Sequence, residues 1–194
     1  MLIQKLNIFR NEHITAENTF QYLKGYLKKS DFILDVGSGT GILAELIKKE
    51  IRSTIRCIDV TNINKTNLSL IIFNGKNIPF NDNTFSVVLC CFVLHHSQNQ
   101  EKLIKEMKRV SKSKIFIFED IPLTFFDRIM FKFHSLHSEM RYKSRRLEFH
   151  NMEEWKEIFE KNNLNIEKII EIKKSRQLWY PVSRRLFILK KQKA

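Results

Sequence analysis

Three glycines occupy alternate positions in the stretch FILDVGSGTGILAEL, which covers residues 32–46. They are Gly37, Gly39 and Gly41, and they separate an apolar run typical of a buried strand from an apolar periodicity typical of a helix. A glycine-rich turn between strand and helix exposes backbone N–H groups at the positive end of a helix dipole and carries no side chain that would hold a ligand away. We therefore expect a nucleotide-like ligand to lie against this turn.

An acidic residue follows at a distance that suits the sugar of such a ligand. Asp59 ends the next predicted strand, about 20 residues downstream, where a carboxylate accepts hydrogen bonds from ribose hydroxyls in dinucleotide folds. The third glycine comes one position too early for the G-x-G-x-x-G fingerprint, and no Lys followed by Ser or Thr is present for a P-loop. The spacing thus predicts a nucleotide-like ligand but neither of these two nucleotide-binding motifs.

Further polar residues stand where an open parallel sheet places its chemistry, just after the carboxyl ends of strands. His95 and His96 follow one predicted strand, and Glu119 and Asp120 follow the next. His134 lies three residues before His137, so that both would share one face of a predicted helix. Histidine titrates near neutral pH and is suited to act as a base, so we take His96 and His134 as the catalytic candidates.

A metal site is the alternative use of these residues. Glu119, Asp120 and His134 include ligand types that bind divalent metals, but two carboxylates and a helical histidine pair are common by chance. We predict no metal site.

Alternating strand and helix patterns predict the elements that position these residues. They indicate an α/β fold with a doubly wound, mostly parallel sheet and a single domain over residues 1–194. A leading helix falls within residues 1–30, and an inserted helical cover falls within 122–150. The expected helices are 15–27, 42–49, 101–110, 125–142 and one capped by Asn151 and Glu154; the expected strands are 32–36, 54–58, 68–73, 85–94, 114–118, 165–172 and 185–191.

Composition limits the function classes. The formal charge is +13, with much of the excess in the last third, and a solvated basic face explains it better than a nucleic-acid groove because no recognition motif accompanies it. Three cysteines form no CxxC pair, and neither a signal peptide nor an apolar run of the roughly 20 residues that cross a bilayer occurs. We expect a soluble cytoplasmic protein without membrane insertion.

The motifs LDVGSGTG, IDV and NGKNIPFNDNTFSVVLCCFVLHH resemble the class I S-adenosylmethionine-dependent methyltransferases, and the region after them resembles the small type 11 members more loosely. The resemblance implies S-adenosylmethionine as cofactor. Asp35 and the three glycines would hold its methionine end, and Asp59 its ribose. Val60 and Ile78 would flank the adenine, beside Asn74, which stands where many relatives have an acid.

The function implied is methyl transfer to a small or medium-sized acceptor beneath the cover at 122–150. The basic charge is compatible with an anionic acceptor. Two alternatives stay open. An RNA-binding or RNA-modifying methyltransferase would use the basic charge, although FVLHH replaces the Asn-Pro-Pro-aromatic arrangement of base-amine methylation. The second alternative is a non-catalytic S-adenosylmethionine-binding module, which is suggested by Asn74 in place of the acid of many relatives.

Overall fold

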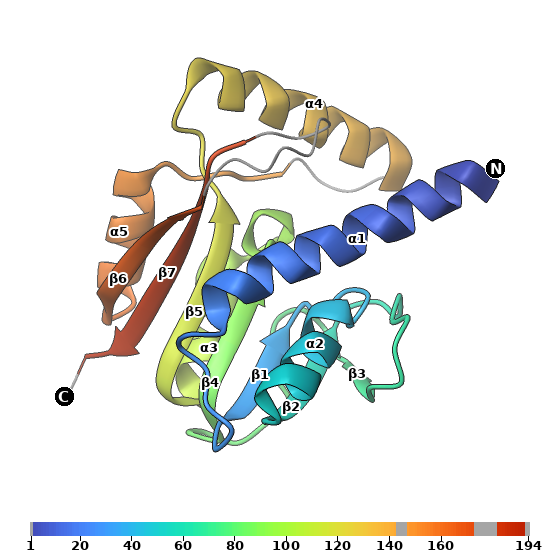
Figure 1. The fold of residues 1–194 in the computed structure, drawn as a ribbon. Helices are drawn as coiled ribbons and strands as arrows, with labels where there is room; N and C mark the ends of the chain where they lie inside the picture. Colours follow the sequence, from blue (N-terminus) through green and yellow to red (C-terminus); the bar gives the residue numbers. More distant parts are fainter. Residues whose placement is uncertain (1, 143–146, 173–181, 193–194) are drawn as a thin grey trace.

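The computed structural model describes residues 2–142, 147–172 and 182–192, and its centre is one seven-stranded sheet (Figure 1). The strands are β1 (Phe32–Val36), β2 (Thr54–Asp59), β3 (Leu70–Ile72), β4 (Phe85–Cys91), β5 (Ser111–Asp120), β6 (Leu164–Ile172) and β7 (Arg184–Lys191). Their order is β3-β2-β1-β4-β5-β7-β6. Only β7 runs against its neighbours, pairing antiparallel with β5 and with β6, so the sheet is mostly parallel as predicted.

Helices cover both faces of the sheet, which is the doubly wound arrangement predicted. The helices α1 (Leu2–Leu23) and α2 (Ile42–Ile51) lie on one face, where Phe20, Leu23 and Ile47 pack against side chains of β1, β4 and β5. The helices α3 (Gln100–Val110) and α5 (Met152–Lys161) lie on the other, where Ile104 and Trp155 join a second apolar cluster. The parallel strands are therefore buried on both faces, which explains their continuous apolar runs.

One helix lies apart from these two layers. The helix α4 (Phe125–Tyr142) crosses beyond the carboxyl ends of the parallel strands, within the predicted insertion at 122–150 (Figure 1). The helix α5 that follows begins with the predicted capping box, because Asn151 Oδ1 accepts the Glu154 N–H and Glu154 Oε2 accepts the Asn151 N–H.

Several predicted element boundaries were wrong by two or more residues: the helix expected over 15–27 ends at Leu23, the strand expected over 68–73 covers Leu70–Ile72, and the strand expected over 114–118 covers Ser111–Asp120. Two further differences stand out. The first helix begins at Leu2 rather than at Thr15. The strand expected over 85–94 ends at Cys91, because Phe92 has a φ of 59° and the chain turns into a short 3-10 helix, η1 (Leu94–His96). Apolar residues continue through this turn, so hydrophobicity alone extends the strand too far.

In the described part of the chain, no helix combines the length and apolar character needed to cross a membrane. The three cysteines are free thiols, with Cys57 and Cys90 buried. Cys90 and Cys91 face opposite sides of the sheet, as expected for neighbours in a strand, since each packs with a different apolar cluster.

Candidate cofactor and acceptor site

The glycine turn lies at the carboxyl end of β1, and the surroundings of its three glycines differ. A Cβ atom on Gly37 would come within 2.3 Å of Val93 Cγ2, and one on Gly41 within 2.5 Å of Asn64 Oδ1. At Gly39 a Cβ would meet no described atom within 4 Å. The protein's own side chains are thus sufficient to require glycine at two positions, and Gly39 alone borders open space where a ligand can approach.

Asp59 holds this turn from the end of the neighbouring strand. Its Oδ2 accepts the Gly39 N–H at 2.8 Å, and its Oδ1 accepts the N–H groups of Val60 at 2.7 Å and Thr61 at 3.3 Å. Asp59 is 8% exposed, so its carboxylate is largely buried and is fixed by the backbone. A ligand hydroxyl that reached it would therefore meet an acceptor that is already oriented.

Asp35 lies one strand away from Asp59 and is 2% exposed. Burial, together with the negative charge of Asp59, raises the pKa of Asp35 from 3.8 to about 7. Within the described residues its carboxyl makes no hydrogen bond, so a cationic ligand group placed beside it would both pair with it and restore its ionised form. The donor set thus suits a ligand that carries a positive charge and a sugar.

The residues expected around an adenine ring differ in exposure. Val60 is 54% exposed, whereas Ile78 is 2% exposed and belongs to the core cluster beneath the sheet. Asn74 is exposed, and its Oδ1 closes a turn by accepting the N–H groups of Lys76 and Asn77. Val60 is therefore the residue of this set that offers apolar surface to a ring.

The segment that carries Ile78 is held by two residues of α3 that sequence reasoning missed. Glu106 Oε2 accepts the Ile78 N–H at 2.8 Å, and the Arg109 guanidinium donates to the carbonyls of Ile78 and Phe80. Glu106 and Arg109 also bond each other. Their three-residue spacing on one helix was the available signal, but it does not reveal the distant backbone groups.

A buried pair fixes the turn after β4. Glu119 Oε1 accepts the N–H groups of Val93 and Leu94, and its Oε2 lies 2.6 Å from His95 Nδ1. Burial disfavours the charged imidazole, but the charge and hydrogen bond of Glu119 outweigh it and raise the pKa of His95 above its usual 6.5. His95 and Glu119 therefore position the backbone at Val93, the residue that packs over Gly37.

His96, the first catalytic candidate, is exposed on η1, and its ring lies 4.3 Å from that of His95 between centroids. The two neighbours thus differ, because the His95 side chain is buried and the His96 side chain is exposed. His134, the second candidate, falls in α4, but its side chain is outside the described part of the structure, as is that of His137.

Aromatic rings link η1 to the covering helix. Phe149 stacks on His95 at 4.9 Å and on Phe131 of α4 at 4.2 Å. Beside this stack is a pocket of about 400 Å³ between α4 and the start of α5. Its lining includes Phe131 and Phe149 together with the cations Arg128 and Lys132.

The carboxylates weighed as metal ligands are engaged otherwise. Glu119 accepts hydrogen bonds from the backbone at the start of η1 and pairs with His95. Asp120 Oδ1 accepts a hydrogen bond from Arg184 Nε at 2.8 Å. Among the described residues no group of three or more His, Cys, Asp or Glu side chains is arranged to hold a metal ion.

Comparison with known proteins agrees with this geometry. Residues 34–118 match the family model described as a methyltransferase domain. The chain is 28% identical over 111 residues to a ribosomal protein L11 methyltransferase of Thermotoga neapolitana, covering 53% of this chain and 41% of the relative. A probable methyltransferase of Aspergillus luteorubrus is 32% identical over 119 residues, covering 50% of this chain and 42% of that one. The chain thus spans less than half the length of these two curated relatives.

Solved structures agree over nearly the whole chain. A SAM-dependent methyltransferase of Archaeoglobus fulgidus has a TM-score of 0.75 at 16% identity and covers 98% of this chain and 100% of its own. One of Thermotoga maritima, titled a possible histamine N-methyltransferase, has a TM-score of 0.72 at 16% identity, with 97% of each chain covered.

The fold is that of the class I S-adenosylmethionine-dependent methyltransferases, in agreement with the predicted resemblance. Residues 34–118 match the family model of a methyltransferase domain, and this match implies S-adenosylmethionine as the cofactor.

Proposed function

We propose that the protein transfers a methyl group from S-adenosylmethionine to a small or medium-sized acceptor. The observation that carries the proposal is the pair of buried carboxylates, Asp35 and Asp59, beside the open space at Gly39. A cofactor with a cationic amino-acid end, a ribose and an adenine matches these groups one by one. Bound there, S-adenosylmethionine supplies an activated methyl group.

The residues of this chain would act mainly by positioning the cofactor and the acceptor. Asp59 would accept the ribose hydroxyls while keeping its bond to the Gly39 N–H, and Asp35 would pair with the ammonium of the methionine end. Val60 would cover one side of the adenine with apolar surface, with Asn74 and Ile78 further along the same edge. Alignment of two reactants can supply on the order of 7–11 kcal/mol of the barrier reduction in such a transfer.

The acceptor would enter from the side of α4. His96 is exposed at the carboxyl end of β4, where it would take a proton from an acceptor whose nucleophilic atom begins protonated. His134 is proposed for the same function from α4. The pocket that contains Arg128 and Lys132 beside two phenyl rings suits an acceptor with an apolar part and a negative charge.

Calorimetric titration with S-adenosylmethionine and with S-adenosylhomocysteine tests the proposal. Asp59→Ala should weaken the binding of either ligand by about 1.5–3 kcal/mol, the contribution of hydrogen bonds to a charged group. Asp31→Ala is the matched control, since Asp31 is also hydrogen-bonded but precedes β1 at the opposite end of the sheet. Asp31→Ala should leave the affinity unchanged.

Each other outcome has a defined meaning. Equal affinity of native protein and Asp59→Ala would refute the ribose assignment. Absence of any binding to the native chain would refute the cofactor site. Tight binding without turnover across a broad acceptor panel would instead identify the non-catalytic module, and binding of RNA that weakens steeply with salt would favour the RNA-modifying alternative.

A further inference from the structure

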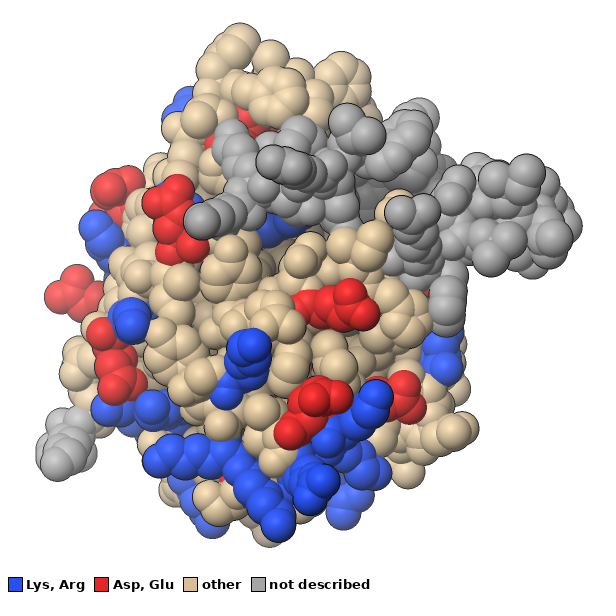
Figure 2. Space-filling model, viewed as in Figure 1, with Lys and Arg blue, Asp and Glu red and all other residues tan. Residues whose placement is uncertain are grey.

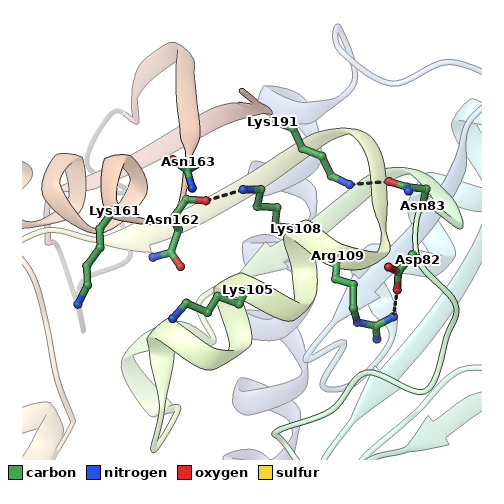
Figure 3. A pocket seen from close by; sticks show the side chains of 9 residues that line it. All are labelled: Asp82, Asn83, Lys105, Lys108, Arg109, Lys161, Asn162, Asn163 and Lys191. Atoms are coloured by element: carbon green, nitrogen blue, oxygen red, sulfur yellow. Dashed lines mark hydrogen bonds and ion pairs between the residues drawn. The ribbon is translucent and has the colours of Figure 1, made fainter. Parts of the chain in front are cut away.

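A second pocket lies at the other end of the sheet, away from the glycine turn. It has a volume of about 350 Å³ and is formed where β4 and β5 begin and β7 ends (Figure 3). Its lining comes from the segment before β4, the end of α3, the turn after α5 and the last residue of β7: Asp82, Asn83, Lys105, Lys108, Arg109, Lys161, Asn162, Asn163 and Lys191. Five of these nine side chains are cationic and one is anionic.

Three of the five cations are already neutralised by carboxylates. Arg109 bonds Asp82 at 2.7 Å and Glu106 at 2.8 Å. Lys105 and Lys161 both pair with Glu101, at 3.3 and 3.2 Å. These three therefore contribute little net charge to the pocket.

Lys108 and Lys191 have only neutral hydrogen-bond partners among the described residues. Lys108 Nζ donates to the Asn162 carbonyl at 2.9 Å, and Lys191 Nζ donates to Asn83 Oδ1 at 2.6 Å, from two sides of the pocket (Figure 3). Each ammonium has three N–H groups, so donors remain on both. Partial burial and, to a smaller extent, the nearby charge of Lys108 lower the pKa of Lys191, and the charge of Asp82 opposes this shift.

A further polar group in the same lining has no partner. Asn162 is 4% exposed, and its Oδ1 is buried without a hydrogen-bond partner among the described residues, while its Nδ2 donates to the Ile158 carbonyl. This oxygen has almost no accessible surface, so a donor in the pocket reaches it only after the Asn162 amide turns outward. Buried polar groups in proteins are normally satisfied, so an unsatisfied one in the pocket wall is a second feature that a bound donor would explain.

We propose that this pocket binds a phosphate group, with Lys108 and Lys191 as its two cationic ligands. Two positive charges whose hydrogen-bond partners are neutral match a dianion, and monohydrogen phosphate also carries a hydroxyl that would donate a hydrogen bond to Asn162 Oδ1 once the amide turns outward. A phosphate bound there would replace repulsion between the two lysines with two charge-assisted hydrogen bonds. The same chemistry is available from free phosphate and from the backbone of a nucleic acid, and the pocket's volume fits the free ion.

Titration with inorganic phosphate, followed by phosphorus NMR and by calorimetry in a phosphate-free buffer of constant ionic strength, tests the proposal. The native chain should bind phosphate with a Kd of about 1 mM or tighter. Lys108→Gln and Lys191→Gln should each weaken binding at least about tenfold, the effect of losing one hydrogen bond to a charged group. Lys156→Gln, which removes a lysine exposed on α5 outside the pocket, should bind as the native chain does.

Two comparisons separate this site from its alternatives. Saturating S-adenosylhomocysteine should not change the phosphate affinity, because the pocket and the glycine turn lie at opposite ends of the strands. Competition between the two ligands would overturn the assignment and place the phosphate at the glycine turn.

An oligoribonucleotide and acetate complete the test. Binding of the oligonucleotide that depends on Lys108 and Lys191, without binding of free phosphate, would overturn the proposal in favour of a nucleic-acid backbone. Equal affinity for acetate would overturn it in favour of unselective attraction by positive charge. Circular dichroism of both lysine variants should match the native spectrum, so that lost binding reports the pocket rather than the fold.

Discussion

The two ends of the sheet carry opposite charges and hold them in different ways. At the carboxyl end, four acidic side chains are buried: Asp35, Asp59, Glu119 and Asp120. Asp59 and Glu119 are fixed by backbone N–H groups, and Asp120 is fixed by the half-buried Arg184. At the amino end, Lys and Arg side chains gather at the surface (Figure 2). At the carboxyl end, burial raises the free-energy cost of each charge and fixes its orientation. At the amino end, solvent and salt weaken the interactions between the exposed charges.

The largest effect is expected where the buried network is broken. Glu119→Ala leaves two backbone N–H groups and the buried imidazole of His95 without their acceptor, so the free energy of unfolding should fall by about 3–5 kcal/mol. Urea unfolding measures this change. Glu119→Gln keeps a carbonyl acceptor and should cost less, and equal losses for both variants would mean that the hydrogen bonds have no part in the effect.

The glycine turn offers a contrast within one end of the sheet. Gly37→Ala drives a Cβ into Val93 and also strains a φ of 72°, so the contact with Val93 should add about 1–3 kcal/mol to that strain, and Val93→Ala should rescue only the contact. Gly39→Ala meets no described atom and should cost only the backbone strain of its φ of 55°, about 1–2 kcal/mol. Thermal unfolding and titration with S-adenosylhomocysteine should show that Gly39→Ala loses mainly affinity. If Gly39→Ala bound S-adenosylhomocysteine with native affinity, this result would contradict the placement of the ligand against Gly39.

The raised pKa of Asp35 gives the carboxyl end a distinctive pH dependence. Between its ordinary pKa of 3.8 and its folded value of about 7, the native state keeps a proton that the unfolded state has lost. This contribution to stability is complete below the ordinary pKa and is lost as the pH rises through about 7.

Asp35→Asn should therefore flatten the stability profile in that range. Pairing with the cationic end of S-adenosylmethionine should also release a proton from Asp35 near neutral pH. Titrations in buffers of different ionisation enthalpy measure that release, and an unchanged proton count in Asp35→Asn would contradict the pairing.

The smallest effect is expected at the amino end. Lys191→Gln removes the repulsion between Lys191 and Lys108 while keeping a donor for Asn83, so stability should rise slightly, within about 0.5 kcal/mol. Because these charges are partly exposed, added salt should abolish the gain. A salt-independent change in the melting temperature would show that packing, and not charge, is responsible.

Local patterns were enough to predict much of this fold. Continuous apolar runs located the parallel strands, and Asn151 with Glu154 marked the start of α5 because both partners lie within one turn. The glycine turn and Asp59 were likewise predictable, since strand ends and their spacing follow from the chain itself.

Interactions between distant residues were not predictable in this way. The end of β4 depends on Glu119, which lies 26 residues after Val93, and no local pattern shows that its carboxylate accepts those N–H groups. The same holds for Gly37 and Gly41, whose neighbours Val93 and Asn64 come from other loops. A ligand was inferred for all three glycines, although tertiary packing explains two of them.

The position of β7 between β5 and β6 has a consequence for how the chain is made. During synthesis β6 leaves the ribosome before β7, yet β7 is the strand that pairs with it in the described part of the sheet. Residues 164–172 therefore have no partner strand until residues 184–191 have emerged. During that interval their unpaired backbone and apolar side chains are open to association with other chains.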